Sequence, residues 1–175
     1  MHNITDILEE KQFYDLAEQA YFKAIELDPK LAHPYSGLAD LLDKTERVSE
    51  ALEPAIKGVC LGPGVDFTHY IFLKVCPDSS EPWLKVLPEV MNYLKKHPDE
   101  DEVYSFALAG LIRLVRYKKD EKVLELVKAT DMQEKFEPLL LALQARSDRK
   151  VLSSLAPERR ALVIEVMGKI EKEQA

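Results

Sequence analysis

Glycine is scarce in this sequence, and clusters of β-branched residues are few. There are 6 glycines among 175 residues, while leucine, alanine, glutamate and lysine dominate. These four residues have high intrinsic helix propensity. The composition therefore argues against a β-sandwich or barrel and predicts an all-α protein.

Long apolar runs are also missing. The longest candidate, residues 106–115, is interrupted by Arg113, whereas a membrane-spanning helix needs about 18 to 20 apolar residues. Residues 1–10 hold three acids and lack the pattern of a secretory signal or transit peptide. The two cysteines, Cys60 and Cys76, sit among apolar residues, which favours reduced thiols over a disulfide or half a metal site. We predict a cytoplasmic protein with no membrane partner.

An excess of basic residues is absent too. The formal net charge is −7, and residues 1–60 contribute 6 basic against 12 acidic side chains. An acidic first third would repel a phosphate backbone, and proteins that bind nucleic acid usually carry a basic stripe. We therefore expect no nucleic-acid partner.

Catalytic patterns are not found. The four histidines have no metal-ligand spacing, no serine lies in a glycine-framed turn, and no phosphate-binding loop or dinucleotide glycine pattern occurs. We expect a protein that is not an enzyme, with no cofactor and no metal site.

Two prolines mark an internal repeat. Pro29 and Pro63 are 34 residues apart, and the same shift aligns Ala17 with Ala51. Between the prolines, aromatic, leucine and small residues follow the order of the tetratricopeptide repeat signature: Tyr35, Leu38, Ala39, Leu42 and Ala51. The segment thus resembles the tetratricopeptide repeat (TPR) family, most clearly over residues 13–63.

This resemblance implies an all-α, right-handed superhelical solenoid of antiparallel helix pairs. We predict one helical-repeat domain over residues 1–175, with ten to twelve helices. Residues 1–63 would form TPR-like repeats whose first helix is shortened to residues 1–12, and residues 64–175 degenerate helical hairpins. The later helices are expected at 65–75, 81–96, 100–117, 120–129, 133–145 and 157–173. Pro54, Pro88 and Pro138 should each start, kink or split a helix.

One polar face of the first helices is the candidate binding surface. In the TPR family this face lines a concave groove, so the resemblance implies a groove formed by His2, Asp6, Glu9, His33, Ser36, Asp40, Asp43, Tyr70 and Lys74. Most of these residues are acidic or neutral, so the carboxylate-binding activity of some family members is not carried over. Charge complementarity favours a basic or amphipathic protein or peptide. The alternative is an ordinary solvated helix face.

The last predicted helix offers a second surface. Its apolar residues are Leu162, Val163, Val166, Met167 and Ile170. They would either cap the neighbouring helices or form a docking face, including a homodimer contact.

The leading functional prediction is a non-catalytic protein-binding scaffold with an acidic groove. The alternative is a regulatory or oligomerisation region of a larger multidomain protein, such as an NTPase, because the sequence begins partway through a repeat. In that case, apolar surface should be exposed near the first residues.

Overall fold

The computed structural model describes the backbone of residues 4–171 and the side chains of residues 11–171. Ten α-helices and no β-strand occur within residues 4–171, so the expected all-α class is confirmed. The chain divides into two compact units, Met1–Asp78 (unit 1) and Ser79–Ala175 (unit 2), where the sequence pattern predicts one repeat domain. Each unit is described by itself.

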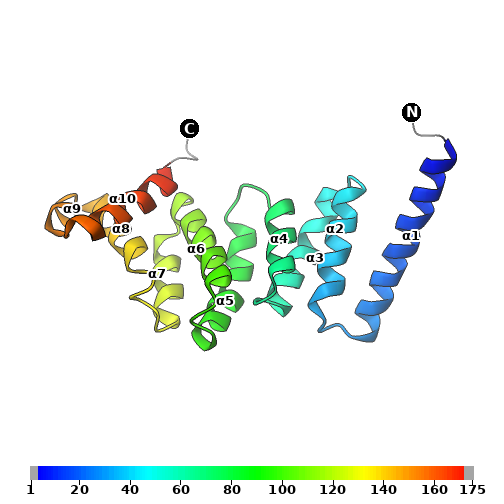
Figure 1. Ribbon diagram of the computed structural model, residues 1–175, viewed down its shortest axis with the longest axis horizontal. Helices are drawn as coiled ribbons and strands as arrows, with labels where there is room; N and C mark the ends of the chain where they lie inside the picture. The colour runs from blue at the N-terminus through cyan, green and yellow to red at the C-terminus, as the bar shows by residue number, and fades with distance from the viewer. Residues whose placement is uncertain (1–3, 172–175) are drawn as a thin grey trace. The chain divides into compact units, whose positions relative to one another are not determined.

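Unit 1 holds four helices: α1 (Ile4–Leu27), α2 (Ala32–Lys44), α3 (Val48–Leu61) and α4 (Asp66–Val75). Helix α2 packs against α1, α3 and α4, and the α2–α3 pair forms a tight hairpin (Figure 1). The expected break after residue 12 does not occur. Residues 4–27 form one helix, because no proline, glycine or turn-forming cluster interrupts them.

Small residues set the close helix crossings of unit 1. A Cβ atom on Gly58 of α3 would overlap the side chain of Ser36 on α2. Likewise, a Cβ on Gly37 would overlap the ring of Tyr21, which packs over α2 from α1. The helices can approach closely at these two points because a glycine has no side chain to hold them apart.

Unit 2 holds six helices: α5 (Glu81–Lys96), α6 (Asp101–Arg116), α7 (Asp120–Ala129), α8 (Glu137–Ser147), α9 (Lys150–Ser154) and α10 (Pro157–Glu171). Helices α5, α6 and α7 contact one another, while α10 packs against α8 and α6. The core includes Trp83, Leu87, Leu111 and Leu139, all at most 2% exposed. The short α9 is not expected from the sequence, because five residues show no helical periodicity.

Two hairpins share the same turn. Glu46 after α2 and Lys118 after α6 both adopt the left-handed conformation, with φ of 62° and 57°. In each, the next residue donates its backbone N–H to a carbonyl five residues back: Arg47 to Leu42 (2.8 Å) and Lys119 to Leu114 (3.0 Å). This is the Schellman ending of a helix. The α2–α3 and α6–α7 hairpins are therefore closed in the same way.

The three prolines behave differently from one another. Pro138 lies in the first turn of α8, where its missing N–H costs nothing, so the prediction of a helix start is confirmed. Pro54 and Pro88 lie inside α3 and α5. Neither splits its helix.

Candidate functional site

The predicted groove residues that the structure describes lie mainly on one surface of unit 1. We call this surface the α2–α4 face, and it consists of His33, Asp40, Asp43 and Lys44 on α2 together with Phe67, Tyr70 and Lys74 on α4. Helices α2 and α4 are in direct contact. The 34-residue spacing, which aligns Asp40 with Lys74, thus corresponds to neighbouring helices in space.

The charged half of the α2–α4 face is an ion-pair cluster. The Lys74 ammonium lies 3.1 Å from one Asp40 oxygen and 2.6 Å from Asp43, and Lys44 lies 2.7 Å from the other Asp40 oxygen. Partial burial acts to raise the pKa of Asp40, but hydrogen bonds from the two lysines hold it below its usual value. Two carboxylates and two ammonium groups leave this cluster without net charge.

The other half of the α2–α4 face is aromatic. The rings of His33 and Phe67 stack with centroids 6.2 Å apart and planes 16° from parallel. Phe67 is 40% exposed and Tyr70 is 62% exposed. Exposed aromatic rings provide large contact areas for a partner at low entropic cost. The aromatic half therefore offers apolar contact area to a partner, whereas the neutralised ion-pair cluster does not.

Ser36 is a wrong prediction within this set. It is fully buried at the crossing of α2 and α3, beneath Gly58, so it cannot line an open groove. The polar spacing that includes it follows the helix period, but the close approach of α3 covers that position. Its hydroxyl oxygen has no hydrogen-bond partner within the described part of the chain.

Three further groove residues cannot be placed. His2 lies outside the described residues, and the side chains of Asp6 and Glu9 are likewise not described. Their backbone, from Ile4 onward, belongs to the continuous helix α1 rather than to a separate short helix.

The predicted docking face of the last helix is largely wrong. Val163, Val166 and Ile170 are 1%, 7% and 3% exposed, because α10 packs against α8 and α6. Met167 is half-buried, and Leu162 alone of the five is exposed. These residues cap unit 2, which is the alternative that the sequence left open.

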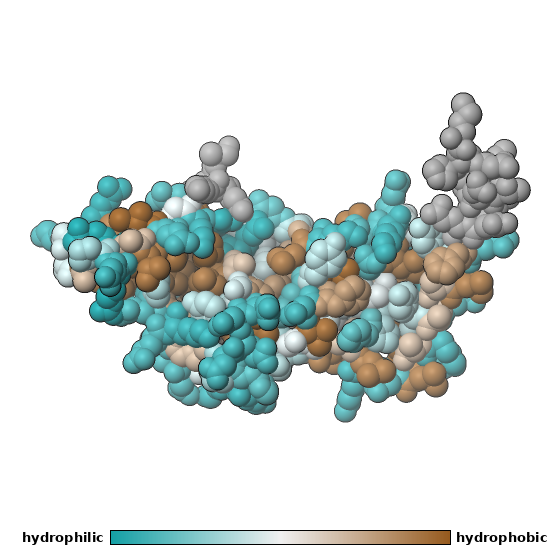
Figure 2. Space-filling model, in the orientation of Figure 1, coloured by the Kyte–Doolittle hydropathy of each residue, from teal (hydrophilic) through white to brown (hydrophobic). Residues whose placement is uncertain are grey.

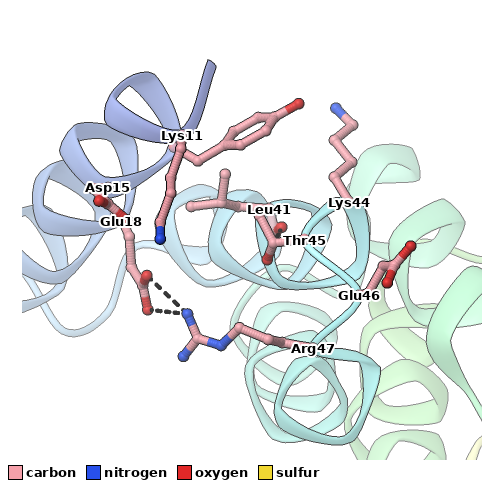
Figure 3. A pocket seen from close by; sticks show the side chains of 9 residues that line it. Lys11, Asp15, Glu18, Leu41, Lys44, Thr45, Glu46 and Arg47 are labelled. Carbon is pink, nitrogen blue, oxygen red and sulfur yellow. Dashed lines mark hydrogen bonds and ion pairs between the residues drawn. The ribbon is translucent and has the colours of Figure 1, made fainter. Parts of the chain in front are cut away.

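A pocket of about 510 Å³ lies between α1 and α2. Figure 3 shows Glu18 and Arg47 closing one side, with Lys11 extending into the pocket and Lys44 pointing away. Arg47 donates two hydrogen bonds to the Glu18 carboxylate, at 2.9 and 3.0 Å, and two more to Glu50. The lining carries equal numbers of acidic and basic residues, namely Asp15, Glu18 and Glu46 against Lys11, Lys44 and Arg47.

This pocket was not foreseen from the sequence. Glu18 and Arg47 are 29 residues apart, so no local pattern connects them. The ion pair between Lys44 and Asp40, in contrast, could be predicted from the sequence, because the two residues are four apart on one helix.

Unit 2 has its own hollow, of about 740 Å³, beside α7, α8 and α9. Its floor is apolar and includes Leu124, Val127, Leu140 and Leu143. This hollow could not be predicted from the sequence, because the unexpected helix α9 forms part of its wall.

No cluster of three or more histidine, cysteine, aspartate or glutamate side chains suited to a metal ion occurs among the described residues. Cys60 and Cys76 are half-buried thiols. Within the described part of the chain, every helix is too short or too polar to span a bilayer.

Comparison with known proteins gives no match, whether with protein-family models, curated proteins or solved structures. The resemblance to the TPR family therefore stays a prediction.

Proposed function

We propose that the chain is a non-catalytic, TPR-like helical-repeat scaffold that binds an amphipathic protein segment along the α2–α4 face. The single observation that carries this proposal is the exposure of the Phe67 and Tyr70 rings next to a charge-neutral ion-pair cluster. Aromatic side chains beside satisfied polar groups are typical of binding surfaces. The half-buried thiols are in keeping with a cytoplasmic scaffold that needs no cofactor.

Two features of the fold support the repeat architecture. The α2–α3 and α6–α7 hairpins are closed by the same left-handed turn. In unit 1, α2 contacts both its hairpin partner α3 and the following helix α4. A further helix stacked on a pair in this way buries apolar surface that the pair alone would expose.

The proposed partner is amphipathic rather than strongly basic. Lys44 and Lys74 already neutralise Asp40 and Asp43, so the described part of the face offers no net negative charge to a cationic ligand. Apolar side chains packing on Phe67 and Tyr70 would supply most of the affinity, as when an amphipathic helix lies in a groove.

Fluorescence anisotropy with three labelled helical peptides tests the proposal. The peptides share one apolar stripe and carry lysine, glutamine or glutamate on the polar face, and a scrambled peptide without the stripe is the negative control. We expect the striped lysine and glutamine peptides to bind, and the double variant Phe67→Ala/Tyr70→Ala to weaken them about tenfold or more.

Leu162→Ala, which removes an exposed apolar side chain from α10, is the matched control and should leave binding unchanged. Binding that depends on the acidic peptide alone, or that survives the double variant, would contradict the proposal.

A second candidate function has one observation in its favour. Phe13, Leu16 and Leu27 of α1 are each at least 66% exposed. This is the apolar surface expected of an oligomerisation region within a larger protein.

A further inference from the structure

The outer side of α1 carries a continuous apolar stripe. Phe13, Leu16, Ala20 and Leu27 follow one another at steps of three, four and seven residues, which places them on one side of a helix. We call them the α1 stripe. Phe13, Leu16 and Leu27 are 67%, 66% and 75% exposed, and Ala20 is exposed as well. Figure 2 shows hydrophobic surface over α1.

The rest of α1 explains why this side stays open. Tyr21 packs over Gly37 of α2, and Glu18 pairs with Arg47, so α1 is held through its inner side. None of its described side chains is buried. Single exposed apolar residues are ordinary, but an aligned stripe marks an interaction surface.

We infer that the α1 stripe is a contact between two copies of this chain, with the two α1 helices antiparallel. The stripe is symmetric about Ala20. Phe13 and Leu27 lie seven residues to either side of it, and Leu16 and Ala24 lie four to either side. An antiparallel pair centred on Ala20 places Phe13 against the second copy's Leu27 and Leu16 against its Ala24. A twofold contact requires this kind of self-complementary pattern.

The position of Lys23 agrees with the antiparallel direction. Lys23 lies seven residues after Leu16 and is exposed, so it shares the stripe's side of the helix. In an antiparallel pair centred on Ala20, Lys23 of one copy comes near Ala17 of the other and meets no second lysine. In a parallel pair, Lys23 would face Lys23 within the seam, and like charges there disfavour association.

Sedimentation equilibrium of the full chain tests the contact. The wild type should show a monomer–dimer equilibrium, and Leu16→Glu should raise the dimer dissociation constant about tenfold or more, because a carboxylate would be buried in the seam. Leu162→Glu is the matched control on α10 and should leave the equilibrium unchanged. A monomeric wild type at every concentration, or a dimer that persists in Leu16→Glu, would overturn the inference.

A charge pair tests the direction of the contact. Phe13→Lys alone should weaken the dimer because it places a charge in the seam, and the double variant Phe13→Lys/Leu27→Glu should dimerise more tightly than the single variant, because an antiparallel pair sets each lysine beside the second copy's glutamate. Failure of the double variant to recover the dimer would overturn the antiparallel arrangement.

Chemical cross-linking tests the register. In a chain with Cys60 and Cys76 replaced by alanine, Ala20→Cys should give a covalent dimer with a short bis-maleimide. Phe22→Cys, roughly 200° around the helix, should not. Equal cross-linking of the two would overturn the register. Because Phe67→Ala/Tyr70→Ala leaves α1 unaltered, failure of the dimer and failure of peptide binding are distinguishable.

Discussion

The first and last described helices, α1 and α10, contrast sharply in how they use their apolar residues. Helix α10 buries Val163, Val166 and Ile170 against α8 and α6. Helix α1 buries none of its described side chains and exposes Phe13, Leu16 and Leu27. Both helices carry apolar residues at helical spacing, so periodicity alone does not tell a packed terminal helix from an open one. The two helices differ in whether neighbouring helices cover their apolar residues.

The largest expected effect comes from truncating one apolar residue on each helix. Ile170→Ala should lower the free energy of unfolding of unit 2 by about 2–4 kcal/mol, because it leaves a cavity in a packed site. Leu16→Ala should change that of unit 1 by less than about 0.5 kcal/mol. Urea unfolding of both variants, at concentrations where the chain is monomeric, measures the difference. Equal losses of unfolding free energy in the two variants would contradict the contrast between a packed α10 and an open α1.

The stability of unit 1 should depend on pH through the packed helix α4, because that helix carries a buried histidine. His69 of α4 is buried and its ring Nε2 lies 2.9 Å from the Pro63 carbonyl. Burial lowers the pKa of His69, although the Pro63 carbonyl and Asp66 act in the opposite direction. The unfolded chain therefore binds this proton more readily than the folded chain, so stability falls as the pH drops below about 6.5.

His69→Gln should flatten this dependence, and His97→Gln, at an exposed histidine in unit 2, should leave it in place. Urea unfolding midpoints measured from about pH 7.5 down to about pH 5, a range that brackets the ordinary pKa of histidine, give the slope of stability against pH. An unchanged slope in His69→Gln would mean that another group produces it.

A small effect, in the stabilising direction, is expected at Ser36. Its hydroxyl oxygen is buried without a hydrogen-bond partner among the described residues, and such a group costs free energy. Ser36→Ala should therefore raise the free energy of unfolding by up to about 1 kcal/mol and leave binding of the striped peptides unaltered. A loss of binding would restore Ser36 to the α2–α4 face and contradict its buried position.

Sequence periodicity predicted most of the helices, because their ends carry chemical signals. The expected bounds 81–96 and 120–129 match α5 and α7, where Ser80 and Pro82 mark one start and the acidic Asp120 the other. The unbroken α1 was missed, since the repeat alignment placed a break where no residue produces one.

The site was harder to foresee than the fold. The 34-residue spacing brought Asp40 and Lys74 together as neighbours, but not the consequence that Lys74 and Lys44 neutralise the acids. Ser36 and the α10 residues fell on expected faces that neighbouring helices cover. Which face of a helix stays open depends on packing between segments far apart in the chain, and a local sequence pattern cannot predict that packing.

Hydrogen–deuterium exchange of α1 and α10 at increasing protein concentration tests the central contrast most directly. If the α1 stripe is an open contact surface, the amides of α1 should gain protection as concentration rises, while those of α10 stay equally protected throughout. Protection of α1 that is independent of concentration, or protection that rises in α10 instead, would contradict this account.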